Sequence, residues 1–174
     1  MSDILQTLKE RRSCRKYKAE LIGQESLDKI LEAGTFAASG MGKQSAIIIA
    51  ITNKEIRDKI SELNARVMGR TGFDPFYGAP EIIVVLANKA CPTYIYDGSL
   101  VTGNMMNEAE SLDVATCWIH RAKEVFESDE GKELLKQWGI EGDYEGVANL
   151  AVGFADAPKN APAPRKENYI YYVK

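Results

Sequence analysis

The stretch Ala46-Ile-Ile-Ile-Ala-Ile-Thr52 is a continuous run of apolar, mostly β-branched residues, and a helical pattern begins directly after it at Asn53. A run of this kind predicts a strand that is covered on both faces. In the helix that follows, apolar residues recur at steps of three and four, and Asn53 is suited to cap its first turn. A buried strand followed by an amphipathic helix is typical of proteins built from layers of strands and helices.

The same two patterns continue on both sides of this stretch. Towards the carboxyl end they predict strands at residues 82–87, 114–119 and 147–154, and helices at residues 97–112 and around residues 134–138. Towards the amino end they predict a helix from about Gln24 and a short helix over residues 4–8, capped by Ser2 or Asp3. Four buried strands interleaved with helices predict a layered sandwich. A Rossmann domain is not expected, because no Gly-x-Gly-x-x-Gly motif follows a strand.

The composition is that of one globular domain. The chain has 174 residues, of which 45% are hydrophobic and 27% charged, and its formal net charge is −3. This charge gives no reason to expect nucleic acid or an anionic membrane as a partner, and the apolar runs are far shorter than the roughly 20 residues of a membrane span. The three cysteines form no Cys-x-x-Cys pair, there is one histidine, and no secretory signal opens the chain. We therefore expect a cytoplasmic protein without a metal site.

Positive charge is concentrated near both ends of the chain. Residues 11–16 read Arg-Arg-Ser-Cys-Arg-Lys, and residues 164–168 read Pro-Arg-Lys-Glu-Asn. Arginines and a hydroxyl at this density suit a phosphate group, because guanidinium groups form charge-assisted, bidentate hydrogen bonds with it. The alternative for each segment is a basic turn that is only solvated. Taken together, Arg165 and Lys166 would complete a phosphate clasp that the first segment begins.

Two further segments are candidates for a ligand site. Residues 39–45, Ser-Gly-Met-Gly-Lys-Gln-Ser, lead into the first strand, and their glycines allow the backbone to approach a flat ligand closely. An ordinary helix-to-strand connection is the alternative, and a P-loop is excluded because Gln44 stands where a hydroxyl is needed. Residues 117–121, Cys-Trp-Ile-His-Arg, end a strand, which is where α/β sheets place ligands. A nucleophilic pair of Cys117 and His120 is not expected, since their spacing directs the two side chains to opposite faces.

The last residues predict contact with a second copy of the chain. From Ala157 the sequence holds three prolines and then ends Asn168-Tyr-Ile-Tyr-Tyr-Val173 before Lys174. A proline-spaced segment does not fold back as a compact helix, and an aromatic strand left free would be an exposed edge. Pairing with a partner's sheet edge removes that exposure. We therefore expect one domain over residues 1–174, with residues 157–174 as an extended tail that docks on the partner subunit.

Five segments, in order along the chain, resemble the FMN-dependent nitroreductase family. They are Arg11-Arg-Ser-Cys-Arg15, Ala37-Ala-Ser-Gly-Met-Gly-Lys-Gln44, Asp74-Pro-Phe-Tyr-Gly-Ala-Pro80, Asp97-Gly-Ser-Leu-Val-Thr-Gly-Asn104 and Pro164-Arg-Lys-Glu-Asn168. The resemblance covers essentially the whole chain. It implies an α+β fold, namely a nitroreductase-like α/β/α sandwich with a central mixed, mostly antiparallel sheet. It also implies an intertwined homodimer with two FMN sites at the interface.

The resemblance further implies how each FMN is held. Arg11, Ser13 and Arg165 correspond to a phosphate clasp, and Arg15 to a cation near the flavin N1 and C2 carbonyl edge. Residues 119–121 present mostly backbone to the cofactor, and the partner's residues 39–41 border the ring. The full implied cofactor-binding set is Arg11, Arg12, Ser13, Arg15, Ala38, Ser39, Gly40, Met41, Gln44, Ile119, His120, Arg121, Arg165 and Lys166. No catalytic side chain is implied, because FMN carries the chemistry.

The activity implied by the resemblance is electron transfer from NADH or NADPH, through FMN, to a small organic acceptor such as a nitroaromatic, a quinone or a flavin. Donor and acceptor use one open face of the ring in turn, so ping-pong kinetics are expected. The alternatives are a flavin-binding sensor or storage protein without turnover, and a specialised reductive enzyme of the same fold, such as a dehalogenase. The chain departs from the common family pattern at Gly42, Ser45, Asp113 and Ala115. These departures concern the acceptor rather than FMN binding.

Overall fold

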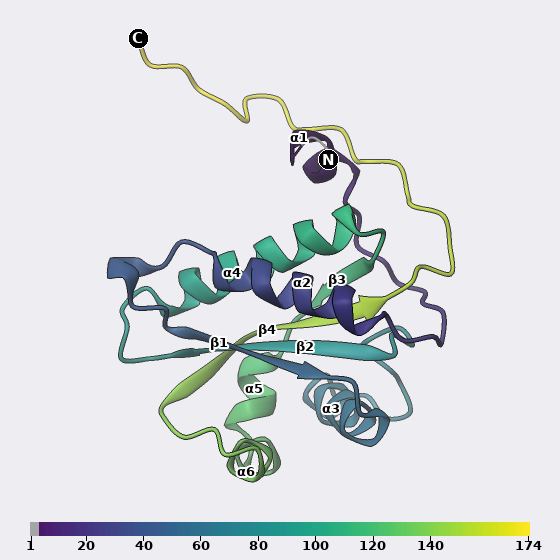
Figure 1. Ribbon diagram of the computed structural model, residues 1–174, viewed down its shortest axis with the longest axis vertical. Coiled ribbons are helices and arrows are strands. Elements are labelled where there is room, and N and C mark those ends of the chain that lie inside the picture. Colours follow the sequence, from purple (N-terminus) through teal and green to yellow (C-terminus); the bar gives the residue numbers. More distant parts are fainter. Residues whose placement is uncertain (1–3) are drawn as a thin grey trace.

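A four-stranded sheet forms the centre of the molecule (Figure 1). The computed structural model describes residues 4–174. The strands are β1 (Ala46–Ile51), β2 (Glu81–Asn88), β3 (Ala115–Ile119) and β4 (Tyr144–Gly153), in the spatial order β1-β2-β4-β3. Neighbouring strands all run antiparallel, and an isolated bridge between Ser13 and Thr116 is parallel. The predicted α+β fold with a mixed, mostly antiparallel sheet is confirmed.

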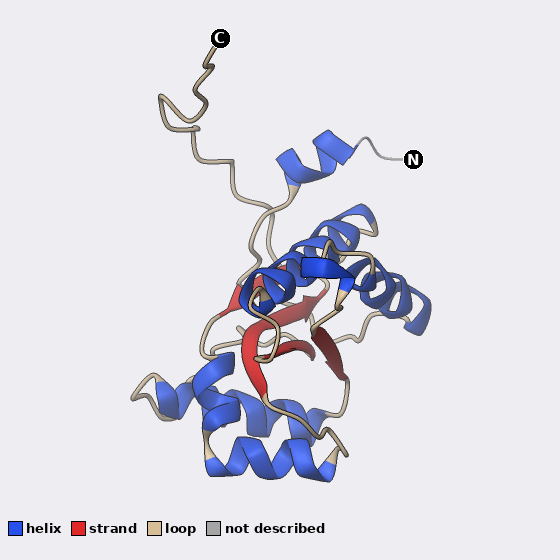
Figure 2. Ribbon diagram, turned by 90° about the vertical axis from the view of Figure 1, so that its left-hand side faces the viewer, coloured by secondary structure: helices blue, strands red, loops and turns tan. Residues whose placement is uncertain are grey.

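Helices cover both faces of the sheet (Figures 1 and 2). On one side lie α2 (Gln24–Thr35) and α4 (Tyr94–Ser111); on the other lie α3 (Lys54–Val67), α5 (Ala122–Glu127) and α6 (Asp129–Gln137). The short α1 (Ile4–Glu10) contacts α4 on the side away from the sheet, and a 3₁₀ turn, η1 (Gly40–Gly42), follows α2. None of the helices within residues 4–174 combines the length and apolar character needed to cross a membrane.

Alternating side chains along β2 divide the core in two. Ile82, Val84 and Leu86 pack against the layer of α3, α5 and α6, whereas Ile83 and Val85 pack against α2 and α4. Successive side chains of a strand point to opposite faces, and both faces of this central strand are covered. A continuous apolar run is therefore required, and the predicted buried strand at residues 82–87 is confirmed.

The burial of β1 is partial. Its apolar run predicts a strand covered on both faces, and β1 is an edge strand that pairs only with β2. Residues 46–49 are half-buried, Ala50 is exposed and only Ile51 is buried. Ile47 and Ile49 pack against the layer of α3, α5 and α6, and Ala46 and Ile48 pack against the layer of α2 and α4, so the predicted cover on both faces is confirmed. The cover is partial because β1 forms the edge of the sheet, which an apolar run does not reveal.

The helix boundaries also refine the predictions. The third long helix begins at Tyr94 rather than near residue 97, and the helical stretch around residues 134–138 is the end of α6, preceded by a separate α5. Ser128 separates these two helices. Its backbone is extended, and its hydroxyl accepts a hydrogen bond from the Gly131 N–H at 3.1 Å, so it begins α6 as an N-cap.

The first turn of α3 is capped as predicted. The Asn53 side chain accepts a hydrogen bond from the Ile56 N–H at 3.0 Å. The predicted cap of α1, at Ser2 or Asp3, lies outside the described residues.

The chain's two ends leave the sandwich on the same side (Figures 1 and 2). Residues 157–174 form no helix or strand and run past α1, away from the body of the molecule. Their apolar end is exposed to solvent, with Tyr169 at 67% and Val173 at 99%. The tail is therefore extended, as the prolines predict.

Candidate functional site

The amino-terminal segment and the tail meet beside β3. Ser13 bridges to Thr116, and the Cys14 N–H donates a hydrogen bond to the Thr116 carbonyl at 2.9 Å. The residue that precedes the tail is tied to the same segment, because the Asp156 N–H donates to the Lys16 carbonyl at 2.9 Å and their side chains form an ion pair at 2.8 Å. Two segments from opposite ends of the sequence therefore lie side by side.

A cavity of about 620 Å³ opens between these two segments and the end of α1. Its lining consists of Leu8, Lys9, Arg11, Arg12, Ser13, Pro162, Ala163 and Arg165. Four of these side chains are cationic, and none of the described lining residues is acidic. Such a lining favours an anion. The structure thus brings together the three predicted clasp residues, Arg11, Ser13 and Arg165, with Arg12 of the wider implied cofactor-binding set.

The two arginines that follow α1 make different contacts. The Arg12 Nη1 donates to the carbonyls of Lys9 at 2.6 Å and Arg11 at 2.7 Å, so it caps the carboxyl end of α1. The Arg12 Nε and the Arg11 Nη1 are buried and have no hydrogen-bond partner among residues 4–174. An unpaired buried donor costs about 1–3 kcal/mol. Arg11 is therefore a group whose hydrogen bonding a bound anion would complete.

Two other predicted residues of these segments lie outside this cavity. Arg15 is exposed and lines a neighbouring cavity of about 270 Å³ together with Ser13 and Cys14. The Lys166 Nζ lies 5.1 Å from the ring centre of Tyr169, which is a cation–π contact. The structure does not bring Lys166 to the clasp.

The predicted residues Ile119, His120 and Arg121 form the turn between β3 and α5. The His120 carbonyl accepts hydrogen bonds from the side-chain amides of Asn64 at 2.8 Å and Asn149 at 3.3 Å. The Arg121 Nε donates to the Asn64 Oδ1 at 2.9 Å, and Arg121 has a left-handed backbone (φ 76°). Both asparagines are fully buried. They therefore hold this turn in a backbone conformation that a residue other than glycine rarely adopts.

Cys117 is not placed as a nucleophile. Its side chain is 3% exposed and belongs to the core, whereas His120 is exposed. Burial raises the pKa of the Cys117 thiol, even though Arg15 and Ser13 act in the other direction. A raised pKa disfavours the reactive thiolate.

The turn that holds Ala38, Ser39, Gly40, Met41 and Gln44 lies at the opposite end of the molecule from the clasp. It follows α2, which runs along the sheet away from the amino-terminal segment, and it is the dark-blue loop at the left of Figure 1. Met41 (φ 53°) and Gln44 (φ 48°) have left-handed backbones, and the Met41 side chain is 73% exposed. Within one chain, this turn and the clasp do not meet.

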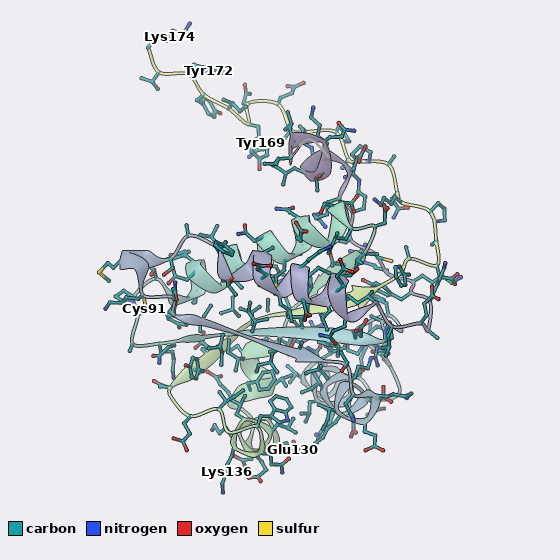
Figure 3. All side chains as sticks on the ribbon, viewed as in Figure 1. Cys91, Glu130, Lys136, Tyr169, Tyr172 and Lys174 are labelled. Carbon is teal, nitrogen blue, oxygen red and sulfur yellow. The ribbon has the colours of Figure 1, made fainter. Side chains whose placement is uncertain are left out.

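A buried carboxylate, Asp97, holds this turn in place. Its side chain lies in the first turn of α4 and is only 3% exposed. It accepts hydrogen bonds from the Ser45 hydroxyl at 2.7 Å, the Gly40 N–H at 3.0 Å and the Thr93 hydroxyl at 3.1 Å. The Cys91 thiol, labelled in Figure 3, is a fourth donor at 3.7 Å. Burial alone would raise the pKa of Asp97, but these hydrogen bonds outweigh it and hold the pKa below its usual value.

Sequence reasoning assigned no role to Asp97, Asn64 or Asn149. The signal for the asparagines is a polar residue inside an otherwise apolar helix face or strand: Asn64 follows Leu63, and Asn149 precedes Leu150. The signal for Asp97 is an acid in the first turn of a long apolar helix. Each signal marks a buried polar group that needs partners, but none of them says which partners the fold supplies.

Comparison with known proteins identifies the family. The model of the nitroreductase family matches residues 8–76. A relative from Archaeoglobus fulgidus, which carries the provisional name NADH dehydrogenase/NAD(P)H nitroreductase, is 30% identical over 165 residues, covering 92% of this chain and 88% of the relative. The chain belongs to the nitroreductase family.

Solved nitroreductases share the fold over their full length. A nitroreductase with bound FMN from Bacteroides fragilis superposes with a TM-score of 0.88 at 26% identity, and one from Desulfitobacterium hafniense with a TM-score of 0.87 at 29% identity; 100% of each chain is covered. Other curated relatives of this chain are longer. The chain spans 60% of a protein from Methanothermobacter thermautotrophicus (28% identical over 67% of this chain) and 25% of an FMN reductase from Bacillus subtilis (40% identical over 36% of this chain).

Proposed function

We propose that this protein is an FMN-dependent oxidoreductase that passes electrons from NADH or NADPH to a small organic acceptor by a ping-pong mechanism. The observation that carries the proposal is the cavity lined by Arg11, Ser13 and Arg165, in which every charged residue of the described lining is cationic. Beside it, the Arg11 Nη1 is buried and has no partner among residues 4–174. A phosphate monoester supplies the missing acceptor. FMN ends in such a group, and it is bound in the nitroreductases of Bacteroides fragilis and Desulfitobacterium hafniense.

The residues present fit this cofactor. Arg11 and Arg165 would donate charge-assisted hydrogen bonds to the phosphate, and the Ser13 hydroxyl would add another. Arg15, beside the clasp, would lie towards the N1 and C2 carbonyl edge of the flavin. The backbone of residues 119–121, on the same strand as the Ser13 bridge, would border the ring from the same chain.

When bound, FMN accepts a hydride from the nicotinamide and delivers electrons to the acceptor. The chain's residues would bind and orient it. Arg15 would favour negative charge on the edge of the ring near it. Cys117 is buried and His120 exposed, so these two residues supply no nucleophile and base pair. Donor and acceptor would use one face of the ring in turn, and nitroaromatics, quinones and flavins are the acceptor classes proposed.

We also propose a homodimer, because the residues assigned to one flavin lie at two ends of one chain. From Asp97 to Ser111 along α4 is about 21 Å at 1.5 Å per residue, and the clasp lies beyond Ser111, beside β3. The turn at residues 38–44 lies at the Asp97 end. A second copy related by a two-fold axis would bring its turn to the clasp of the first copy.

Exposed apolar side chains mark the surface that the second copy would cover. On α1, Ile4 is 79% exposed and Leu5 55%; on α4, Tyr96 is 71% exposed and Leu100 49%. These two helices are in contact with each other. Apolar side chains gathered on one surface of a globular protein are typical of an interface.

The tail would dock on the partner at the open edge of β1. That edge has unpaired backbone groups, and residues 169–173 supply an extended apolar segment that could add a strand to it. A cavity of about 520 Å³ lies beside this edge, between α2, α4 and β1, with Leu31, Ile48 and Val101 in its lining. We propose that residues 1–174 form one domain whose tail, residues 157–174, docks on the partner subunit.

We propose a cytoplasmic location. Cys14, Cys91 and Cys117 are free thiols. Free thiols suit a reducing compartment.

The test of the function is the cofactor and its reduction. Purified protein should be yellow, release FMN on heating, and be bleached by NADH or NADPH without oxygen. Reoxidation by a panel of nitroaromatics, quinones and flavins then identifies the acceptor class. Release of FAD instead would contradict the clasp, and a yellow protein that stays oxidised would favour a sensor or storage protein.

The test of the dimer is removal of residues 168–174. The shortened chain should have a weaker dimer and a lower FMN content, because tail docking and Arg165 belong to one segment. Sedimentation and flavin absorbance measure the two effects, and a chain lacking only Lys174 is the control. A shortened chain that remains a fully flavinated dimer would show that the tail is dispensable.

A further inference from the structure

Asp97 connects segments that are far apart in the sequence. Gly40 and Ser45, which donate to its carboxylate, lie 57 and 52 positions away. An apolar side chain at this buried position would need no partner, whereas a carboxylate there must be given hydrogen bonds. The carboxylate therefore determines where residues 39–45 lie relative to α4.

The hydrogen bonds of Asp97 reach both ends of the turn. Gly40 donates to Oδ1 near its start, and Ser45 donates to Oδ2 at its end. Between them, the Gln44 N–H donates to the Ser39 hydroxyl at 2.7 Å and closes the turn. Gly40 is packed so closely that a Cβ there would lie 2.1 Å from the Thr93 Oγ1. The turn is thus held in one conformation.

We propose that Asp97 is a positioning residue for the flavin site, and that it acts across the dimer interface. By holding residues 39–45, it sets how donor and acceptor approach the flavin ring that the partner's clasp holds. This rests on the proposed function, which places the turn against the ring of the partner's FMN. Because Asp97 acts through the turn and not through the phosphate, its loss changes the rate of flavin reduction more than the retention of FMN.

Asp97→Asn is the first variant to test. The amide oxygen still accepts from Gly40, but the amide nitrogen does not accept from Ser45 or Thr93. In FMN-saturated protein, we expect the limiting rate of anaerobic flavin reduction by NADH to fall by about tenfold or more, because two hydrogen bonds to the charged carboxylate are lost. The Kd for FMN should change little. Stopped-flow absorbance and fluorescence titration measure the two quantities.

Thr102→Val is the matched control. Thr102 is buried on the same helix and donates to the Gly98 carbonyl at 2.9 Å, away from the turn. This variant should be reduced at the wild-type rate. Equal slowing of Thr102→Val and Asp97→Asn would mean that any disturbance of α4 slows reduction, which contradicts a specific role for the carboxylate.

Ser45→Ala serves if Asp97→Asn does not fold. It removes one donor and leaves the carboxylate, and reduction should slow by several-fold while the Kd for FMN is unchanged. A wild-type limiting rate in either FMN-loaded variant would overturn the proposal. A loss of FMN affinity as large as that of Arg11→Ala would also overturn it, because the turn would then act in retention.

Mixed dimers of Arg11→Ala and Asp97→Asn chains test the action across the interface. With limiting FMN, the cofactor loads the intact clasp of the Asp97→Asn chain. If the turn comes from the partner, this site is complete, since the Arg11→Ala chain has an intact turn, and reduction proceeds at the wild-type rate. Slow reduction would place the turn and the clasp of one site in the same chain, and would overturn this part of the proposal.

Failure of the proposed function would look different. Wild-type protein that holds no FMN, or holds FMN that neither nicotinamide reduces, contradicts the function before any variant is compared. Failure of the Asp97 proposal leaves the wild-type protein flavinated and active, with only the comparison between variants altered.

Discussion

At the amino-terminal end of the molecule, Arg11 keeps a buried guanidinium nitrogen without a partner among residues 4–174, and the described lining of its cavity contains no acidic side chain. At the far end of α2, the buried Asp97 carboxylate accepts hydrogen bonds from Gly40, Ser45 and Thr93. Both clusters contain buried polar atoms, although Arg11 as a whole is half-buried and Arg165 is exposed. They differ in whether the protein alone supplies hydrogen-bond partners for these atoms.

This difference separates a binding site, the clasp around Arg11, from a structural anchor, the Asp97 carboxylate with its hydrogen-bond donors. An unpaired buried donor lowers the stability of the free protein, and a ligand that supplies the acceptor recovers that stability. A carboxylate with all its partners imposes one arrangement on the chain whether or not a ligand is present. Substitutions at the clasp should therefore change ligand affinity, and substitutions at the anchor should change the stability of the free protein.

The largest effect is expected for Asp97→Ala. It should lower the free energy of unfolding of FMN-free protein by about 3 kcal/mol, because several buried donors lose their acceptor together. Urea unfolding followed by circular dichroism measures this. Thr102→Val, which removes a single buried hydrogen bond, should cost about 1 kcal/mol. If both variants cost the same, the anchor is no stronger than an ordinary hydrogen bond.

Arg11→Ala should weaken FMN binding and leave the stability of the FMN-free protein unchanged. The Kd for FMN should rise by about tenfold or more, since a charge-assisted hydrogen bond contributes about 1.5–3 kcal/mol. The free energy of unfolding of FMN-free protein should not fall, because the Arg11 Nη1 has no partner to lose within residues 4–174. Fluorescence titration of the apoprotein and urea unfolding give the two values.

Arg66→Ala is the control for Arg11→Ala. Arg66 is an exposed arginine whose partner, Glu130 at 2.7 Å, is also exposed. Its loss should leave the Kd for FMN unchanged. If both substitutions raised the Kd for FMN equally, FMN binding would depend on overall positive charge and not on the clasp.

The stability that Asp97 contributes should depend on pH. Hydrogen bonds hold the pKa of Asp97 below the value of 3.8 for an ordinary aspartate, so its contribution to stability is present above that pH and is lost as pH falls through the lower pKa of the folded state. The stability difference between wild type and Asp97→Asn should be constant from about pH 7 to 5 and narrow below about pH 4. Urea unfolding across this range tests this.

The smallest effect is expected when a substitution in the clasp and one at Asp97 are combined. Because the length of α4 separates them, the changes in unfolding free energy of Arg11→Ala and Asp97→Asn should add to within about 0.5 kcal/mol in the double variant. A larger interaction energy in monomeric, FMN-free protein would mean that the two clusters communicate through the chain itself.

Local sequence patterns predicted the central strand of the core, but not which strand forms the edge of the sheet or where every helix lies. The run at residues 82–87 is the buried central strand, and Asn53 caps α3 as its position indicates. The equally apolar run of β1 is a half-exposed edge, and the sequence patterns did not predict α5, which Ser128 separates from α6. Periodicity reports that a segment has an apolar side. It does not report how many neighbours cover that side.

The sequence by itself determined the order of strands and helices, the positive charge of residues 11–15 and 165, and the extended tail, because each depends on residues that are neighbours in the chain. Only the tertiary structure decided that the Arg11 Nη1 is buried without a partner among residues 4–174, and that Asp97 holds a turn more than 50 positions away. A hydrogen bond between distant residues exists only where the packing of helices on the sheet brings donor and acceptor within about 3 Å. Composition and spacing do not contain that distance.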